Sequence, residues 1–160
     1  MKKPLILFTL FALLLSFSAC SKEEPLHVDM QSELRKRPTI NLSLEDGTSI
    51  PGISGNYCTA IVCMNFPDPD FSTLSYTPYT NGTDLFFTVE FTDSINALGI
   101  KTLNTAGEVT HRELPYTMQD ANTFVFEEPF PDDEKEIVLH ILIDFVNEGR
   151  AHYYFPLQLQ

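Results

Sequence analysis

The pattern of residues 135–159 brings a carboxylate and an imidazole face to face. Polar and apolar side chains alternate along residues 135–146 and again along 150–159, which predicts two β-strands joined in a hairpin. With a three-residue loop at 147–149, Asp144 lies directly opposite His152. A carboxylate that faces an imidazole favours the charged form of the imidazole, so we expect the pKa of His152 to be raised. The alternative is an exposed cross-strand pair that contributes under about 1 kcal/mol.

The same face of this hairpin carries apolar side chains that point outward. The register places Leu142 opposite Tyr154 and His140 opposite Pro156. An outward Leu and Tyr on adjacent strands are more apolar than solvation requires, which favours contact with a partner. If other parts of the chain cover this face, the same side chains form a second buried layer instead. The candidate binding residues are His140, Leu142, Asp144, His152 and Tyr154.

Motifs for catalysis or metal binding are absent from the sequence. Residues 52–55, Gly-Ile-Ser-Gly, are one residue short of a nucleophile elbow, and there is no glycine-rich phosphate loop or dinucleotide fingerprint. The histidines at 27, 111, 140 and 152 show no metal-ligand spacing. Acidic residues at 68–70 and 132–134 could attract calcium, but turn chemistry explains both groups. We therefore expect a non-enzymatic protein without a cofactor or a metal.

The N-terminal segment has the pattern of an export signal that ends at a cysteine. Lys2 and Lys3 precede an apolar run from 5 to 15 and small residues at 16, 18 and 19. The run is shorter than the roughly 20 residues that a membrane-spanning helix needs. Phe17-Ser18-Ala19-Cys20 resembles the lipobox of bacterial lipoproteins, although that family prefers Leu where Phe17 stands. The resemblance implies that the signal helix, residues 1–19, is removed and that Cys20 is acylated, for example with palmitate. A plain secretory signal is the alternative.

A charged segment follows the lipobox. Residues 20–37 have no sustained apolar period, which predicts a flexible tether. Within it, residues 21–24 (Ser-Lys-Glu-Glu) are similar to the signal that sends some lipoproteins of the Bacteroidetes to the cell surface, and a solvated spacer is the alternative. Removal of Lys2 and Lys3 leaves 8 of the 10 basic residues against 22 acidic ones, a formal charge of −14. This charge argues against nucleic acid as a partner, and solubility beside an acidic envelope explains it equally well.

The remaining residues, 38–160, are enough for one domain with a single core. The whole chain has 13 Phe, 6 Tyr and 11 Pro, and short apolar runs stand between Gly, Asn and Asp, which indicates β-structure. Besides the last hairpin, alternation predicts strands at 39–44, 84–92, 98–103 and 123–126. About seven short antiparallel strands predict an immunoglobulin-like β-sandwich, with a small β-barrel as the alternative.

Loop chemistry predicts how some of these strands pair. A three-residue loop at 45–47 sets Leu42 opposite Ile50 and puts Gly47 where a left-handed residue is required, and residues 105–107 form a similar loop. In the last hairpin the loop at 147–149 makes one face wholly apolar through four pairs: Phe145 with Ala151, Ile143 with Tyr153, Ile141 with Phe155, and Leu139 with Leu157. Pro156 cannot donate to a ladder, so we expect an edge strand or a bulge there. The proline-containing segment 65–79 predicts a loop with a brief strand near Leu74.

Two cysteines remain once Cys20 is assigned to lipid. In an exported chain Cys58 and Cys63 are expected to form a disulfide, which closes a short loop and stabilises the fold by roughly 2 kcal/mol. A redox pair would prefer Cys-x-x-Cys, and zinc needs more ligands. We therefore interpret the bond as a structural staple.

Two stretches carry a resemblance to a known family. Residues 55–58 (Gly-Asn-Tyr-Cys) with a second Cys shortly after, and the final segment 148–155 (Glu-Gly-Arg-Ala-His-Tyr-Tyr-Phe), resemble a group of small uncharacterised lipoproteins of bacilli. That group usually has Ser where Asn56 stands and Trp where Thr59 stands. The resemblance implies an immunoglobulin-like sandwich with a disulfide loop, and it implies no activity.

These features together predict a lipoprotein on the extracytoplasmic face of a bacterial membrane, or on the outer membrane or cell surface of a Gram-negative cell. We expect a non-enzymatic module that binds a peptide, a glycan or a protein of the envelope. The alternative is an inhibitor or sensor of envelope hydrolases, because small lysozyme-inhibitor lipoproteins also have a Tyr near a disulfide Cys and an acidic protein suits a basic enzyme.

The anchor can be tested at Cys20. Two or three acyl chains, each contributing about 0.8 kcal/mol per buried methylene, hold a protein on a membrane effectively for good. We expect Cys20→Ala, or treatment with globomycin, to alter processing and to move the protein from the membrane fraction to the soluble fraction in an immunoblot. Unchanged partitioning after both treatments would contradict the lipoprotein prediction.

Overall fold

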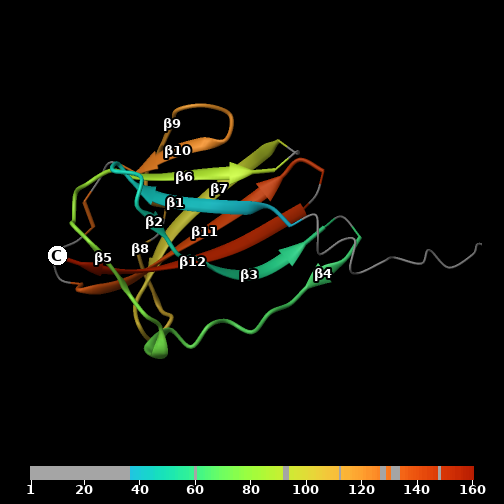
Figure 1. Cartoon of the computed structure of the whole chain (residues 1–160). Helices are drawn as coiled ribbons and strands as arrows, with labels where there is room; N and C mark the ends of the chain where they lie inside the picture. Colours follow the sequence, from blue (N-terminus) through green and yellow to red (C-terminus); the bar gives the residue numbers. More distant parts are fainter. Residues whose placement is uncertain are drawn as a thin grey trace, which may run out of the picture.

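The computed structural model describes residues 37–160, except 60, 92–93, 112, 127–128, 131–133 and 148. These residues form two packed β-sheets (Figure 1). Their one helical element is a 3-10 turn, η1 (Phe71–Thr73), and within them no helix is long and apolar enough to cross a membrane. The predicted lipobox, the signal helix and the tether up to residue 36 lie outside the described residues and stay predictions.

The smaller sheet has five strands in the order β2-β1-β6-β10-β9. These are β1 (Thr39–Leu44), β2 (Ser49–Ile50), β6 (Leu85–Glu90), β9 (Thr117–Met118) and β10 (Thr123–Phe126). The predicted first hairpin is confirmed, because Leu42 lies opposite Ile50 and Gly47 adopts a φ of 82° at the end of the loop. Alternation in β1 and β6 therefore places the apolar side chains on the inner face.

The larger sheet runs in the order β4-β3-β12-β11-β7-β8. These are β3 (Ile53–Cys58), β4 (Cys63–Met64), β7 (Ile95–Leu103), β8 (Val109–His111), β11 (Glu136–Phe145) and β12 (Gly149–Leu159). A further strand, β5 (Thr77–Tyr79), pairs in parallel with the end of β12, and all other pairs are antiparallel. The predicted disulfide between Cys58 and Cys63 is confirmed and joins β3 to β4.

The predicted β-sandwich is confirmed, since neither sheet closes on itself within the described residues. The expected number of about seven strands is too low, because the described residues contain twelve strands. Five of the twelve, β2, β4, β5, β8 and β9, are only two or three residues long. Such short strands carry too little alternation to be recognised in a sequence.

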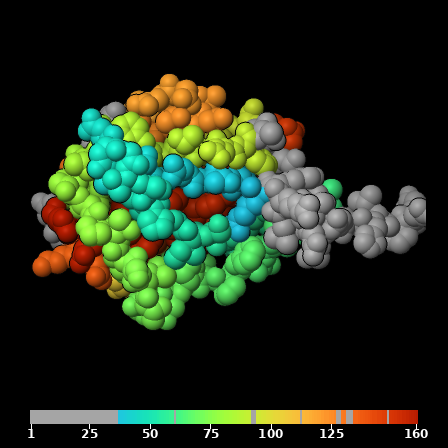
Figure 2. Space-filling view, viewed as in Figure 1, coloured from blue at the N-terminus to red at the C-terminus, as the bar shows by residue number. Residues whose placement is uncertain are grey.

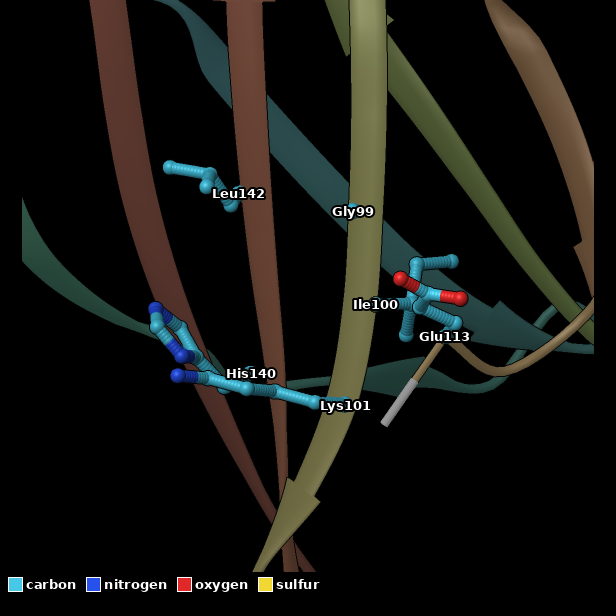
Figure 3. Close-up of a pocket in the computed structure, with 6 residues that line it drawn as sticks. All are labelled: Gly99, Ile100, Lys101, Glu113, His140 and Leu142. Atoms are coloured by element: carbon cyan, nitrogen blue, oxygen red, sulfur yellow. The ribbon is translucent and has the colours of Figure 1, made fainter. Parts of the chain in front are cut away.

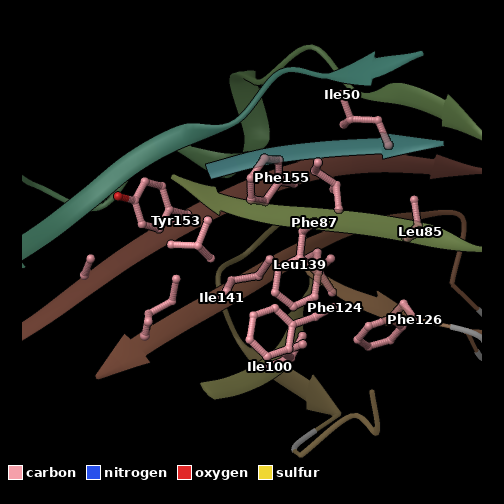
Figure 4. Close-up of a cluster of buried hydrophobic side chains, with 14 of the residues drawn as sticks. Ile50, Leu85, Phe87, Ile100, Phe124, Phe126, Leu139, Ile141, Tyr153 and Phe155 are labelled. Atoms are coloured by element: carbon pink, nitrogen blue, oxygen red, sulfur yellow. The ribbon is translucent and has the colours of Figure 1, made fainter. Parts of the chain in front are cut away.

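The core lies between the two sheets and is rich in aromatic rings (Figure 4). Phe87 of β6 stacks on Phe124 of β10, with ring centroids 5.1 Å apart. Leu139 and Ile141 of β11 meet them from the larger sheet and are fully buried. Each such side chain stabilises the fold by about 1.5–3 kcal/mol when it is buried, before chain entropy is subtracted.

One edge of the sandwich leaves a cavity of about 290 Å³ between β1 and β3. Figure 2 shows these two strands side by side, in blue and green, with atoms of the C-terminal strand visible between them. Tyr153 donates a hydrogen bond to the carbonyl of Pro38, and Arg37 donates one to the carbonyl of Gly55 at 2.7 Å. The start of the described chain is thereby held against β3 and β12.

The predicted register of the last hairpin is wrong by two residues. Phe145 lies opposite Gly149 and Ile141 opposite Tyr153, so the loop spans residues 146–148. A slip of two residues keeps the same side chains facing inward, and the apolar pattern alone cannot distinguish the two registers. Gly149 is left-handed, with a φ of 92°, but it is the first residue of β12 and not the last residue of the loop.

Close packing at Gly149 accounts for the observed register. A Cβ atom at this position would lie 2.1 Å from the carbonyl oxygen of Cys58, so only glycine allows the backbone of β3 to approach here. The β3–β12 pairing begins at the same place, with Arg150 opposite Cys58. The position of glycine under β3 thus determines where β12 starts.

Contrary to expectation, Pro156 makes β12 neither an edge strand nor a bulged one at that position, since the pairing with β11 is continuous through it. The pairing of β12 with β3 ends at Tyr154, and its pairing with β5 starts at Leu157. The amide of Leu159 donates to Lys135 on the β11 side, so the alternating pattern turns position 156 toward the other side. Pro156 therefore falls in the break between two neighbouring strands, where no ladder donor is needed.

The strand expected near Leu74 is also absent. Asp70 caps η1 by accepting a hydrogen bond from the amide of Ser72 at 3.2 Å, and the strand in this segment is β5, further along. Phe71 of η1 packs on the outward face of the larger sheet, beside Leu103 and Val138. The segment therefore covers part of that face.

Two glycine substitutions test the packing at Gly149. Gly47→Ala has open space around it and should cost about 1–2 kcal/mol of unfolding free energy, because its left-handed backbone strains a residue with a Cβ. Gly149→Ala carries the same strain and also collides with Cys58, so we expect it to cost about 1–3 kcal/mol more. Urea unfolding measures both values, and equal losses would show that β3 does not approach β12 this closely.

Candidate functional site

The candidate site lies on the outward face of the larger sheet. Lys101 of β7, His140 of β11 and Tyr154 of β12 lie side by side, and we call them the lysine row. The next outward positions form the glycine row, which consists of Gly99, Leu142 and His152. Because alternate residues of a strand share a face, the two rows are neighbours on one surface.

The two ends of this surface are closed in different ways. At one end the ring of Phe71 packs against Tyr154, with centroids 5.4 Å apart, over buried Leu103 and Val138. At the other end Asp144 and Arg150 form an ion pair with a 2.5 Å contact between Oδ1 and Nε. Between these two ends the surface is hollow over the two rows.

Two cavities of about 210 Å³ and about 260 Å³ occupy this hollow and share Lys101 and His140 in their walls. We refer to them together as the trough. Gly99, Leu142 and Glu113 border the first cavity (Figure 3). Asp68, Phe71, His152 and Tyr154 border the second. Glu113 has a left-handed backbone with a φ of 55°, which is uncommon for a residue with a side chain.

A pair of histidines lies between the two cavities. His140 Nε2 and His152 Nδ1 are 3.1 Å apart, so one imidazole donates a hydrogen bond to the other. No third His, Cys, Asp or Glu of the described residues joins them in a group that could hold a metal ion. The pair is thus a hydrogen-bonded unit that joins β11 to β12 on the outer face.

Burial favours the neutral form of both imidazoles. Only 6% of the His140 surface is exposed, and this burial, together with the charge of Lys101, lowers the pKa of His140 to about 3. Burial also lowers the pKa of His152, and Arg150 and Lys101 act in the same direction. Asp144 acts in the opposite direction but more weakly, so the expectation that the pKa of His152 is raised is wrong. In the observed register Asp144 lies opposite Arg150, and His152 lies opposite Leu142.

Tyr154 is buried and not part of an exposed patch, contrary to prediction. Its ring stacks on His140 with centroids 4.5 Å apart, and its hydroxyl donates to Asp68 Oδ1 at 2.9 Å. Burial is the main reason that the pKa of Tyr154 is raised. Leu142 remains partly exposed. The outward face of the larger sheet is therefore a second buried layer where Phe71 covers it, and it is open to solvent at Leu142.

Several residues of the trough were not predicted. The strand at 98–103 was expected, but its pairing with β11 was not, so Lys101 and Gly99 were missed. Asp68 and Phe71 belong to a segment without strand or helix period. One signal in the sequence could have indicated this site. Gly99 stands in the interior of an alternating strand, and such a glycine often marks the close approach of a ligand.

Neither a protein-family model, nor a curated protein, nor a solved structure matches this chain. The resemblance to lipoproteins of bacilli and the immunoglobulin-like form of the sandwich therefore stay predictions. What the site does has to be argued from the chemistry of the trough.

The buried imidazole makes stability depend on pH. Below pH 6.5 an unfolded His takes up a proton, whereas His140 in the fold takes one up only near pH 3, so stability falls as the pH drops through this window. Between pH 7 and pH 5 we expect the parent to lose about 1–2 kcal/mol more than His140→Leu or His140→Gln, which do not titrate. Urea unfolding at both pH values measures this difference, and parallel losses in parent and variants would contradict it.

Proposed function

We propose that the protein is a lipid-anchored module of the bacterial cell envelope that binds an envelope component non-covalently in the trough. The observation that carries this proposal is the hollow over β7, β11 and β12 at the centre of the larger sheet. The lipobox pattern at residues 17–20 supports the anchor. Ligand sites of this kind are concave and have a few polar groups placed among apolar ones.

Gly99 supports a binding role for the trough. Glycine in a strand interior weakens the strand and offers no side chain to pack, so it needs a compensating reason. A Cβ atom at Gly99 would lie 3.9 Å from Leu142, which is ordinary contact, so the backbone does not require glycine here. The missing side chain instead leaves the first cavity open.

The composition of the trough supports binding rather than covalent catalysis. Among the described residues that line it there is no serine, threonine or cysteine to act as a nucleophile. Its two imidazoles bond to each other, and the Tyr154 hydroxyl bonds to Asp68. These hydrogen bonds therefore fix the positions of the side chains that form the wall of the trough, and they leave N–H donors for a ligand.

An inhibitor of envelope hydrolases is the second candidate, and one observation favours it. Ile61 is 59% exposed in the loop that the Cys58–Cys63 disulfide closes. A rigid loop with an exposed apolar residue can enter the cleft of an enzyme at a low entropic cost. The two candidates use different surfaces, so substitutions can separate them.

Filling the trough tests the first candidate. Gly99→Val places a branched side chain in the first cavity on a strand that tolerates it, so we expect at least roughly tenfold weaker capture of envelope components by the tagged full chain. Ala97→Val is the matched control, since Ala97 is exposed on the same strand two positions away and does not line the trough.

The captured components are identified by cross-linking and mass spectrometry, with thermal unfolding as a check on folding. If Ile61→Asp loses capture and Gly99→Val does not, the inhibitor hypothesis is favoured and the hypothesis of binding in the trough is contradicted. Equal capture by all variants would contradict both candidates.

A further inference from the structure

We infer that the trough recognises a carboxylate of a peptide, held between the Lys101 ammonium and the Nε2–H of His152. This inference rests on the proposed binding function and names the chemistry of its ligand. The two groups belong to neighbouring rows and border the same cavity.

Lys101 is the first observation. Its ammonium forms no hydrogen bond and no ion pair with any other described residue, in a chain that has 22 acidic residues against 10 basic ones. Figure 3 shows the side chain running from β7 toward His140, while Glu113 lies on the other side of β7. A structural lysine at this place would be expected to pair with a nearby carboxylate. An unpaired one in a cavity is available to an anion.

The histidine pair is the second observation. His140 Nδ1 is buried and has no hydrogen-bond partner among the described residues. A buried N–H without an acceptor is rarer and less tolerable than an acceptor without a donor. The favoured arrangement therefore leaves Nδ1 of His140 without a proton, so that His140 Nε2–H donates to His152 Nδ1. His152 then carries its own proton on Nε2, and the half-buried ring offers this N–H to the second cavity.

Asp68 indicates the rest of the ligand. It borders the same cavity, and its Oδ1 accepts the hydrogen bond of Tyr154, while no other described residue donates a hydrogen bond to its Oδ2. A dianionic phosphate would be repelled by this carboxylate, and only one lysine is present to offset its charge. A peptide end places an amide N–H next to a carboxylate, so it can donate to Asp68 while it accepts from Lys101 and His152.

The test is a titration of the labelled full chain, followed by heteronuclear NMR. N-acetyl-Ala-Ala carries the carboxylate, and N-acetyl-Ala-Ala-amide is the same peptide without it. We expect saturable shifts of Lys101, His152 and Gly99 with the acid and none with the amide. Lys101→Met should weaken binding of the acid roughly tenfold or more, because a charge-assisted hydrogen bond is lost.

Matched variants separate the roles of the Lys101 charge and the His152 N–H donor from general effects of substitution on the fold. Lys135→Met removes an exposed lysine outside the trough and should leave the affinity unchanged. His152→Gln keeps an N–H donor and should retain binding in part, whereas His152→Leu should lose it. If His152→Gln and His152→Leu bind equally, the role of the imidazole donor is overturned.

The remaining outcomes distinguish this inference from the proposed function. If the peptide acid and the peptide amide bind equally well in the trough, recognition of a carboxylate is overturned while the proposed binding function stands. If glucuronate shifts the same residues and the peptide acid does not, the peptide source is overturned in favour of an anionic glycan. If no carboxylate binds, the inference fails whether or not Gly99→Val abolishes capture from the envelope.

Discussion

The architecture depends on the contact between Gly149 and the backbone of Cys58. β12 is paired on both sides, with β11 on one flank and with β3 and β5 on the other, so its register is shared by the whole larger sheet. The glycine fits directly under the Cys58 carbonyl, where any side chain would collide. A slip by two residues would keep the same apolar faces buried. It would, however, put Ala151 in the place of Gly149, where the close approach of Cys58 forbids a Cβ atom.

The trough is a consequence of that register. With the slipped pairing His140 would face Pro156, and the two histidines would no longer be diagonal neighbours. In the observed register Tyr154 lies opposite His140 and stacks on it, and His152 comes within hydrogen-bond distance. The arrangement has a cost, because His140 is buried and one of its nitrogens has no hydrogen-bond partner among the described residues. Buried polar groups that stability alone does not require are typical of functional sites.

The parts of this structure that were predictable are those encoded locally. The hairpin of β1 and β2 follows from a glycine at the third loop position, and the strands of β6 and β10 follow from alternation. The outward face of β11 and β12 was also predicted, but a period of two cannot select between registers that differ by two. The partner of β7 depends on contacts between distant residues, so Lys101 could not be placed beside His140. Phe71 and Asp68 come from a segment with no period, and nothing local shows which face it covers.

The net negative charge of the protein affects how an anionic ligand reaches the trough. An acidic protein repels an anionic ligand at a distance, but at physiological salt this repulsion is screened beyond about 8 Å. Within the trough the nearest groups dominate, and these include the Lys101 ammonium and the His152 N–H as well as the carboxylates of Asp68 and Glu113. A ligand must therefore come close before it is attracted, which slows capture of free molecules from solution. If both the proposed module and its ligand are held on the same envelope, the high local concentration offsets that slow encounter. A shallow site with few charged contacts then suffices.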